Sequence, residues 1–273
     1  MIKFFRRIRQ NLLTENKFKK YIVYAIGEIV LVVLGILIAL QINTWNEKVQ
    51  ERKEEQKVLL NLRTELTGNL TFLKYIKRNK EGALLSMRVL MDECTNNPDY
   101  KNHNLDSLLG KAFIAGWKFV SHTGALTNVL KSDKLNLISN DSLKGLLISL
   151  PTVIDFVAME DDSYRSDMHN YYLPFLAKYY QTKNITNEIN QLEIDWTSEP
   201  SRFKRNPEDL LNNPEFESVL NSQLIFMKFS LFSIQYLEQA FETILPIIEE
   251  EIDNNHSSVL DNQQFYEDGL PIN

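Results

Sequence analysis

The sequence predicts an all-α protein in which an N-terminal transmembrane helix continues into a long stalk helix and an antiparallel helical bundle. Three observations lead to this fold class. Residues 21–42 form an apolar run, residues 45–91 lack proline and space their apolar side chains mostly three or four apart, and no segment shows strand alternation, a βαβ pattern or a repeat. With 9 glycines, 8 prolines and 44% hydrophobic residues in 273, the composition excludes disordered and collagen-like proteins.

The first 20 residues are strongly basic. They contain seven lysines and arginines and one acid, a net charge of +6, and since the whole chain carries −6, residues 21–273 carry −12. Basic residues beside a membrane segment are retained on the cytoplasmic side. We therefore expect the N-terminus in the cytoplasm and residues 44–273 outside it.

The run from Tyr21 to Ile42 is apolar apart from Glu28, Gln41 and its two tyrosines. As a helix it spans about 33 Å, against about 30 Å of bilayer hydrocarbon. It passes into Gln41–Glu47 without the small-residue cleavage site of a signal peptide, so we expect an anchor that is kept. The expected parts are a basic cytoplasmic tail at 1–20, a transmembrane helix at 21–43, an extracytoplasmic helical bundle at 44–253 and a polar tail at 254–273.

Glu28 lies inside the apolar run, where a carboxylate costs on the order of 3 kcal/mol at a helix centre. At 100° per residue, Gly35 and Ala39 lie about 20° to either side of Glu28. Gly35 and Ala39 also form a small-xxx-small pair that allows close helix approach. We expect these three residues to form a transmembrane association face; the alternative is that Glu28 reaches the nearby interface by itself.

Two stretches carry a resemblance. Gly27–Glu47, after the basic tail, resembles the N-terminal signature of an uncharacterised family of bacterial single-pass membrane proteins with a domain of unknown function, and Leu130–Leu143 is similar to a central segment of that family. The resemblance implies an anchor in the inner membrane of a Gram-negative cell and a helical periplasmic domain. It implies no activity, substrate or catalytic residue.

The membrane helix has no glycine or proline break between Asn43 and Gln56, so we expect it to continue as a stalk through residues 45–91. A turn that ends this helix is expected over Cys94–Asn104, which contains Asn96–Asp99. The next helices are expected at Leu105–Val120, at His122–Leu130 and at Asp141–Leu150.

Asn140 or Asp141 is expected to cap the last of these helices. A further helix is expected from Pro151 or Thr152 to about Lys178, interrupted or kinked near Pro174. Residues 181–214, which are polar and contain three prolines, are the least regular part.

A final long helix is expected over Pro214–Glu251, with a bend at Pro246 and a polar tail after it. Its expected buried side consists of Val219, Ile225, Phe226, Phe229, Phe232, Tyr236, Phe241 and Ile244.

The motifs of common enzymes are absent from the sequence. A single cysteine, Cys94, and four scattered histidines exclude an internal disulfide and predict no metal site, and there is no glycine-rich phosphate loop. No G-x-S-x-G motif frames Ser121-His122 or Ser139–Asp141, and Glu160–Asp162 is more typical of a solvated helix face. We therefore predict no catalytic residue and no cofactor.

Aromatic residues concentrate in one region. They predict either a ligand pocket or, as is more typical at helical spacing, core packing. The residues of this possible ligand pocket are Tyr164, His169, Tyr171, Tyr172, Phe175, Tyr179 and Trp196.

The predicted function is that of a non-enzymatic, membrane-anchored interaction module of the cell envelope. Its expected partners are the lipid bilayer and either a second copy of the chain or another membrane protein. The acidic domain argues against nucleic acid. One alternative is a periplasmic small-molecule sensor or accessory subunit signalling through a partner, and a second is an envelope hydrolase, because a catalytic triad can be dispersed in sequence. A sensor predicts a closed apolar cavity near residues 171–180, whereas a scaffold predicts an exposed apolar patch.

Overall fold

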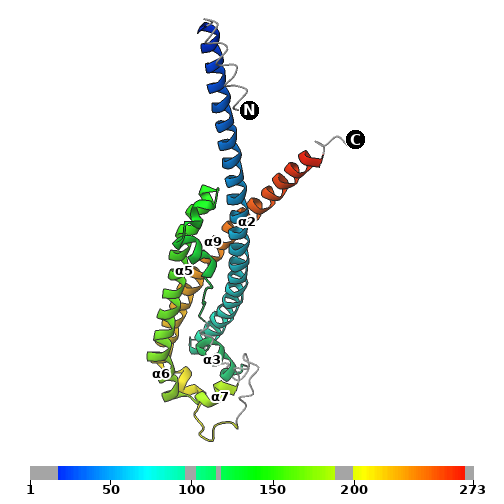
Figure 1. Cartoon of the computed structure of the whole chain (residues 1–273). Coiled ribbons are helices and arrows are strands. Elements are labelled where there is room, and N and C mark those ends of the chain that lie inside the picture. The colour runs from blue at the N-terminus through cyan, green and yellow to red at the C-terminus, as the bar shows by residue number, and fades with distance from the viewer. Residues whose placement is uncertain (1–17, 96–102, 115–117, 188–198, 268–273) are drawn as a thin grey trace. The chain divides into compact units, whose positions relative to one another are not determined.

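The computed structural model describes residues 18–95, 103–114, 118–187 and 199–267 (Figure 1). Within these residues the chain is all-α and contains no strand, as predicted. It forms two compact units, residues 1–55 and residues 56–273. The basic tail before residue 18, the turn at Asn96–Asp99 and Trp196 lie outside the described residues.

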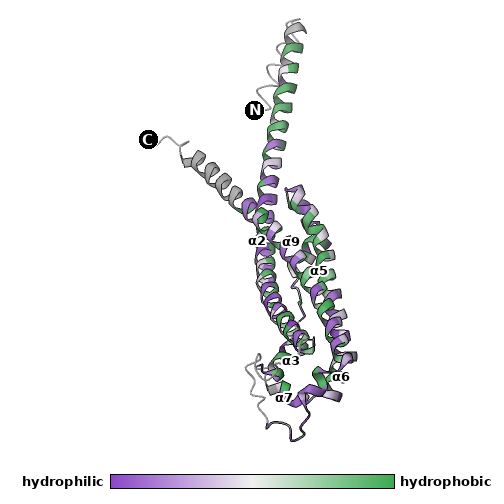
Figure 2. Cartoon of the chain, turned by 180° about the vertical axis from the view of Figure 1, so that it is seen from behind, coloured by the Kyte–Doolittle hydropathy of each residue, from purple (hydrophilic) through white to green (hydrophobic). Residues whose placement is uncertain are grey.

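Helix α2, Phe18–Thr95, supplies the described part of the first unit. Its large apolar side chains from Ile26 to Ile42 are all about half exposed or more, and this stretch is the continuous green segment of Figure 2. The helix then becomes polar, with a hydrogen bond of 2.8 Å from Asn43 Nδ2 to Glu47 Oε1. The expected long N-terminal apolar helix is confirmed.

The second unit is a helical bundle of α2 from residue 56 onward, α5 (Asp141–Asp167) and α9 (Pro214–Glu267). Figure 1 shows α5 and α9 side by side. Residues 143–157 of α5 share one apolar cluster with residues 234–248 of α9, and residues 58–76 of α2 belong to the same cluster. Earlier residues of α9 join later residues of α2 and α5 in a second cluster. Helix α9 is therefore antiparallel to both.

Two elements between α2 and α5 are shorter than expected. Helix α3 is Leu105–Ile114 and α4 is Gly124–Lys131, followed by a 3₁₀ turn, η2, at Asp133–Leu137. Residues 118–123 are not helical. Side chains from other helices form hydrogen bonds with their backbone groups. Asn69 accepts from the N–H of His122 (2.9 Å) and donates to its C=O (2.7 Å), and Asp161 accepts from the N–H of Phe119 (2.9 Å).

Helix α5 differs from expectation because it runs through Pro151 instead of beginning again there. The cap is confirmed, since Asn140 Oδ1 accepts from the N–H of Leu143 at 3.0 Å. Near Pro174 the chain forms a π turn, η3 (Met168–Tyr172), and continues as α6 (Leu173–Tyr179). Proline lacks an N–H and clashes with the carbonyl four residues earlier, and a π turn adds the residue that relieves this clash.

The polar region contains two short helices, α7 (Thr182–Asn187) and α8 (Pro207–Leu211). Asn206 caps α8 by accepting from the N–H of Glu208 at 3.2 Å. Helix α9 includes Pro246 and extends to Glu267, beyond the expected end at Glu251.

Candidate interaction surface

Helix α9 turns one regular row of residues toward the bundle. The row, which we call the inner seam, steps alternately by four and three positions, and every member is buried. It consists of Gln223, Met227, Ser230, Ile234, Leu237, Phe241, Ile244 and Ile248. This is the heptad spacing of helices that pack side by side.

A second apolar row on α9 faces solvent. It consists of Ile225, Phe229, Phe232 and Tyr236, which are 43%, 55%, 61% and 53% exposed. Each lies two positions after a member of the inner seam, and two positions turn a helix by about 200°. The row, which we call the outer stripe, therefore occupies the face opposite the core.

The outer stripe corrects the sequence prediction for this helix. Of the eight residues expected on the buried side, Phe241 and Ile244 are buried, Val219 and Phe226 are partly buried, and the four residues of the outer stripe are exposed. The expected set combined two opposite faces. Because a helix that is apolar on both faces is normally covered on both, the outer stripe is the feature of α9 that the bundle itself does not explain.

The outer stripe is a contiguous apolar surface. With about 150–250 Å² for each aromatic side chain, the exposed fractions leave about 400 Å² of apolar surface in water. Its length along the helix is about 16 Å. Apolar patches of this size on a monomer are often functional.

The two edges of the outer stripe differ in charge. On the helical wheel, exposed Lys228 lies on one edge, and Phe226 lies on the other. Phe226 lines a shallow groove together with Met159, Asp162, Ser163, Ser166 and Asp167 of α5. One edge therefore carries a lysine, and we call it the basic edge. The opposite edge lies beside two carboxylates, of which Asp162 pairs with Lys118, and we call it the acidic edge.

A buried polar layer lies between the two apolar clusters. Lys80 of α2 and Asp161 of α5 form an ion pair, and each is 1% exposed. Lys80 Nζ donates to Ser230 Oγ at 2.5 Å, and Ser230 Oγ donates to Asp161 Oδ1 at 2.9 Å. Burial lowers the pKa of Lys80, and the Asp161 carboxylate opposes this shift.

Sequence reasoning missed this layer. Lys80 lies on the inward face of α2, in a row that is otherwise apolar (Leu73, Ile76, Ala83 and Met87). A lysine at such a position was the signal in the sequence that could have indicated a buried polar group. A serine beside a buried lysine also has the composition of a Ser-Lys hydrolase site. Ser230 is 0% exposed, however, so its hydroxyl has no access to a substrate in this conformation.

Two of the other residues considered for hydrolysis, His122 and Asn140, have structural contacts. The backbone of His122 is held by Asn69, and Asn140 caps α5 and donates to Glu251 Oε1 at 2.8 Å. Asp162 pairs with Lys118 at 2.5 Å, whereas Asp161 of the same acidic run turns into the core. The described part of the chain contains no group of three or more His, Cys, Asp or Glu side chains that could hold a metal ion.

The predicted ligand pocket is divided between core and surface. Tyr164, Tyr172 and Phe175 are buried. Tyr179 is partly buried, and its ring is tilted by 42° against that of Phe175 at 4.7 Å between ring centroids. Tyr171 and His169 are exposed. The structure thus gives part of this group a packing role, and its role in ligand binding stays a prediction.

Burial also changes the acidity of this cluster. It raises the pKa of Tyr164 and of Tyr172. It raises the pKa of Tyr180 too, where the hydroxyl bonds Asp106 Oδ1 at 2.9 Å. The hydroxyl of Tyr164 donates to the carbonyl of Ala112 at 3.2 Å.

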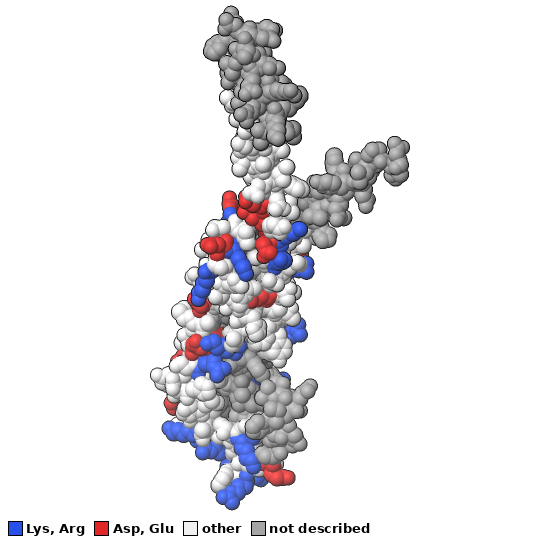
Figure 3. Space-filling view, viewed as in Figure 1, with Lys and Arg blue, Asp and Glu red and all other residues white. Residues whose placement is uncertain are grey.

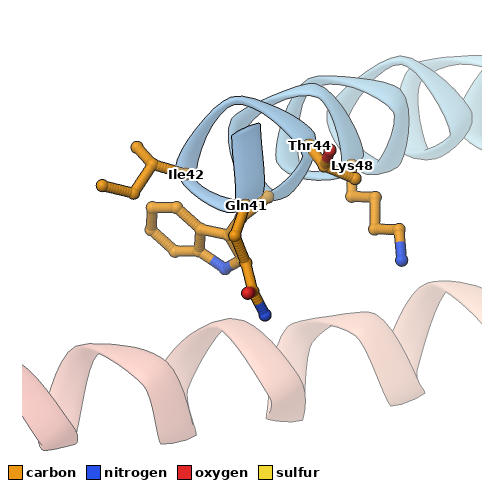
Figure 4. A pocket seen from close by; sticks show the side chains of 5 residues that line it. Gln41, Ile42, Thr44 and Lys48 are labelled. Atoms are coloured by element: carbon orange, nitrogen blue, oxygen red, sulfur yellow. The ribbon is translucent and has the colours of Figure 1, made fainter. Parts of the chain in front are cut away.

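The predicted association face lies in the first unit, on α2. Gly35 and Ala39 are exposed, Glu28 is partly exposed, and a Cβ added at Gly35 would meet no atom within 4 Å. A hollow farther along is lined by Gln41, Ile42, Thr44, Trp45 and Lys48 (Figure 4). All five lining residues belong to one stretch of α2, so we assign no ligand to this hollow.

Two described helices are long and apolar enough to cross a membrane by length and composition. The first lies within Ala25–Thr95, and none of its most apolar window is buried. The second, Asp141–Tyr179, is partly buried and packs on α9, as expected for a core helix. On the face drawn in Figure 3, the apolar stretch of α2 is white, and side chains of both charges lie over the second unit. The N-terminal helix is therefore a candidate membrane span.

Comparison with known proteins agrees with this picture without adding an activity. The model of a family of unknown function, DUF6090, matches residues 28–159, from the apolar helix into α5. The chain is thus similar to this uncharacterised family over about half of its length. No curated protein and no solved structure matches the chain.

Proposed function

We propose that the chain is a membrane-anchored helical interaction module of a Gram-negative cell envelope, which acts by binding a second copy of itself or another envelope protein. The outer stripe of α9 carries this proposal. Four neighbouring apolar side chains, about half exposed, lie on a helix whose opposite face already fills the core. Burying about 400 Å² of apolar surface against a partner would contribute on the order of 10 kcal/mol before the costs of association.

The anchor is the second part of the proposal. Residues 21–43 form the single transmembrane helix, the basic tail lies in the cytoplasm, and the bundle lies in the periplasm. The exposed apolar stretch of α2 and the +6 charge of the first 20 residues support this arrangement. The resemblance to bacterial single-pass proteins supports the compartment.

Within the membrane, we propose that Glu28, Gly35 and Ala39 form an additional contact between helices. All three lie on α2, and the small side chains let a partner helix approach. In a membrane reporter of helix association, Glu28→Leu is expected to weaken the signal, with Val32→Leu as the control. An unchanged signal with Glu28→Leu would exclude this contact.

A native pull-down tests the function of the outer stripe. The full-length chain, tagged at its C-terminus, is extracted in mild detergent from host membranes, and stoichiometric partners are identified. Phe229→Glu with Phe232→Glu should remove the partner, because charges would enter the buried interface. Ile148→Glu, at a residue that is 57% exposed on α5, is the matched control. Equal recovery from all three proteins would contradict the proposal.

A further inference from the structure

We infer that the outer stripe binds the outer stripe of a second copy of this chain, with the two α9 helices parallel; this inference rests on the proposed interaction function. The stripe has the 4-3-4 spacing of a heptad interface. It contains no charged residue, so two identical stripes do not repel each other. A two-fold axis along the helices places each residue beside its own counterpart, Phe229 against Phe229 and Phe232 against Phe232.

The edge charges select the parallel arrangement. A two-fold axis parallel to the helices brings the basic edge of one copy against the acidic edge of the other. An antiparallel pair would bring each edge against the same edge of its partner. Lys228 would then face Lys228, and the acidic groove beside Phe226 would face itself. Charge complementarity therefore favours parallel copies.

The levels of the charged groups agree with this pairing. Lys228 lies two positions from Phe226, about 3 Å along the helix axis. Asp161 bonds Ser230 and α5 is antiparallel to α9, so Asp167 lies near the level of residue 224 of α9, and in the second copy it lies about 6 Å along the axis from Lys228. Asp162 of this groove already pairs with Lys118, which makes Asp167 the preferred carboxylate for a new ion pair.

The area is sufficient for a pair of anchored copies. Pairing two stripes removes about 800 Å² of apolar surface from water. With the polar residues at the edges, the total buried surface comes near roughly 1,000 Å², which is the lower limit for a specific interface. An interface at this lower limit is weak in solution. Two chains in one membrane share an orientation and a high effective concentration, which compensates for a small contact.

Disulfide trapping tests the pairing and its direction in full-length chains in host membranes. The native cysteine is first replaced by Cys94→Ser, and single cysteines are then introduced as Ile225→Cys, Tyr236→Cys and, as an exposed control on α4, Asn128→Cys. Parallel copies should link Tyr236→Cys to itself and Ile225→Cys to itself under mild oxidation. Antiparallel copies would link only a mixture of the two variants, and that pattern would overturn the inference.

A charge exchange tests the edges. The number of chains per particle is counted by stepwise photobleaching of the labelled full-length chain in lipid vesicles. Lys228→Glu or Asp167→Lys alone should weaken the dimer about five- to tenfold, and the double variant should restore it, because the exchanged pair attracts again. A merely structural role of either residue predicts no restoration, and that result would remove the proposed ion pair.

These outcomes separate the inference from the proposed function. One outcome is that the chain is monomeric and that a different protein is lost from the pull-down of Phe229→Glu with Phe232→Glu. The proposal that the partner is a second copy is then wrong, and the proposed interaction function stands. If dimers persist in that variant but disappear with Glu28→Leu, the membrane helix holds the pair and the inference is overturned. If neither dimers nor partners depend on the outer stripe, both proposals fail.

Discussion

The buried ion pair shows how single residues stabilise the bundle. Lys80 and Asp161 are each 1% exposed, and each has further hydrogen bonds, to Ser230 and to the N–H of Phe119. Such a pair is weak evidence for net stability, because desolvation offsets the attraction. Removing one partner is a different matter, since it leaves a buried charge without compensation.

We predict that Lys80→Met lowers the free energy of unfolding by about 3–5 kcal/mol, because Asp161 stays buried without its cation. The double variant Lys80→Met with Asp161→Leu should recover most of this loss. Chemical denaturation of the full-length chain in detergent, followed by circular dichroism, gives both values. A double variant less stable than Lys80→Met would contradict this explanation, because removing the unpaired charge of Asp161 would then bring no gain.

The tyrosines give the second cluster an alkaline limit. Burial raises the pKa of Tyr164, Tyr172 and Tyr180 above the ordinary value of 10.0. Above about pH 10 the unfolded chain therefore releases protons that the folded chain keeps, and stability falls as pH rises. Unfolding measured between pH 9 and 11 should show this decline, and Tyr180→Phe should make it shallower. A slope unaffected by Tyr180→Phe would contradict the assignment.

At the scale of elements, the sequence predicted which segments are helical better than where they end. The long α2, the Asn140 cap and the break near Pro174 follow from local patterns. The non-helical residues 118–123 do not, because Asn69 and Asp161, which are far away in sequence, form hydrogen bonds with their backbone groups. The outer stripe was missed for a similar reason. Apolar periodicity identifies apolar rows, but it does not say which row has a partner within the chain.

Helix α4 illustrates a cap supplied from a distance. Thr123 provides no side-chain cap, and Glu65 of α2 instead accepts from the N–H of Ala125 (2.6 Å) and of Leu126 (3.0 Å). A carboxylate at this position satisfies free N–H groups and opposes the helix dipole.

We predict that Glu65→Ala lowers the free energy of unfolding by about 1–2 kcal/mol, as for loss of an N-cap. Glu81→Ala, at an exposed position of the same helix, is the matched control and should change it by less than about 0.5 kcal/mol. Denaturant unfolding compares the two. Equal losses would mean that helix propensity, and not the contact with α4, is responsible.

At the scale of the whole molecule, the two units imply two environments. Residues 1–55 carry the exposed apolar stretch, and residues 56–273 carry their own apolar clusters. The proposed anchor therefore predicts that the chain stays with the membrane under alkaline carbonate and leaves it only in detergent.

The orientation has its own test. A C-terminal alkaline phosphatase fusion, active only outside the cytoplasm, should be active in a Gram-negative host. Replacing the basic residues of the first 20 by glutamine should reduce that activity, since they are expected to hold the tail inside. The opposite orientation would follow if the wild-type phosphatase fusion is inactive and a separate fusion of a fluorescent protein to the C-terminus is bright in the cytoplasm.

The inner seam has one further consequence, for force along α9. Its regular spacing makes a slide of α9 by seven residues almost neutral for apolar contacts, because one apolar residue would replace another at most levels. Ser230 removes this freedom: a slide would bring either Leu237 or Gln223 against Lys80 and Asp161. Leucine offers no hydrogen bond, and the longer glutamine does not fit the space of a hydroxyl. An axial pull on α9 therefore has to break the hydrogen bonds of the polar layer before the helix can slide.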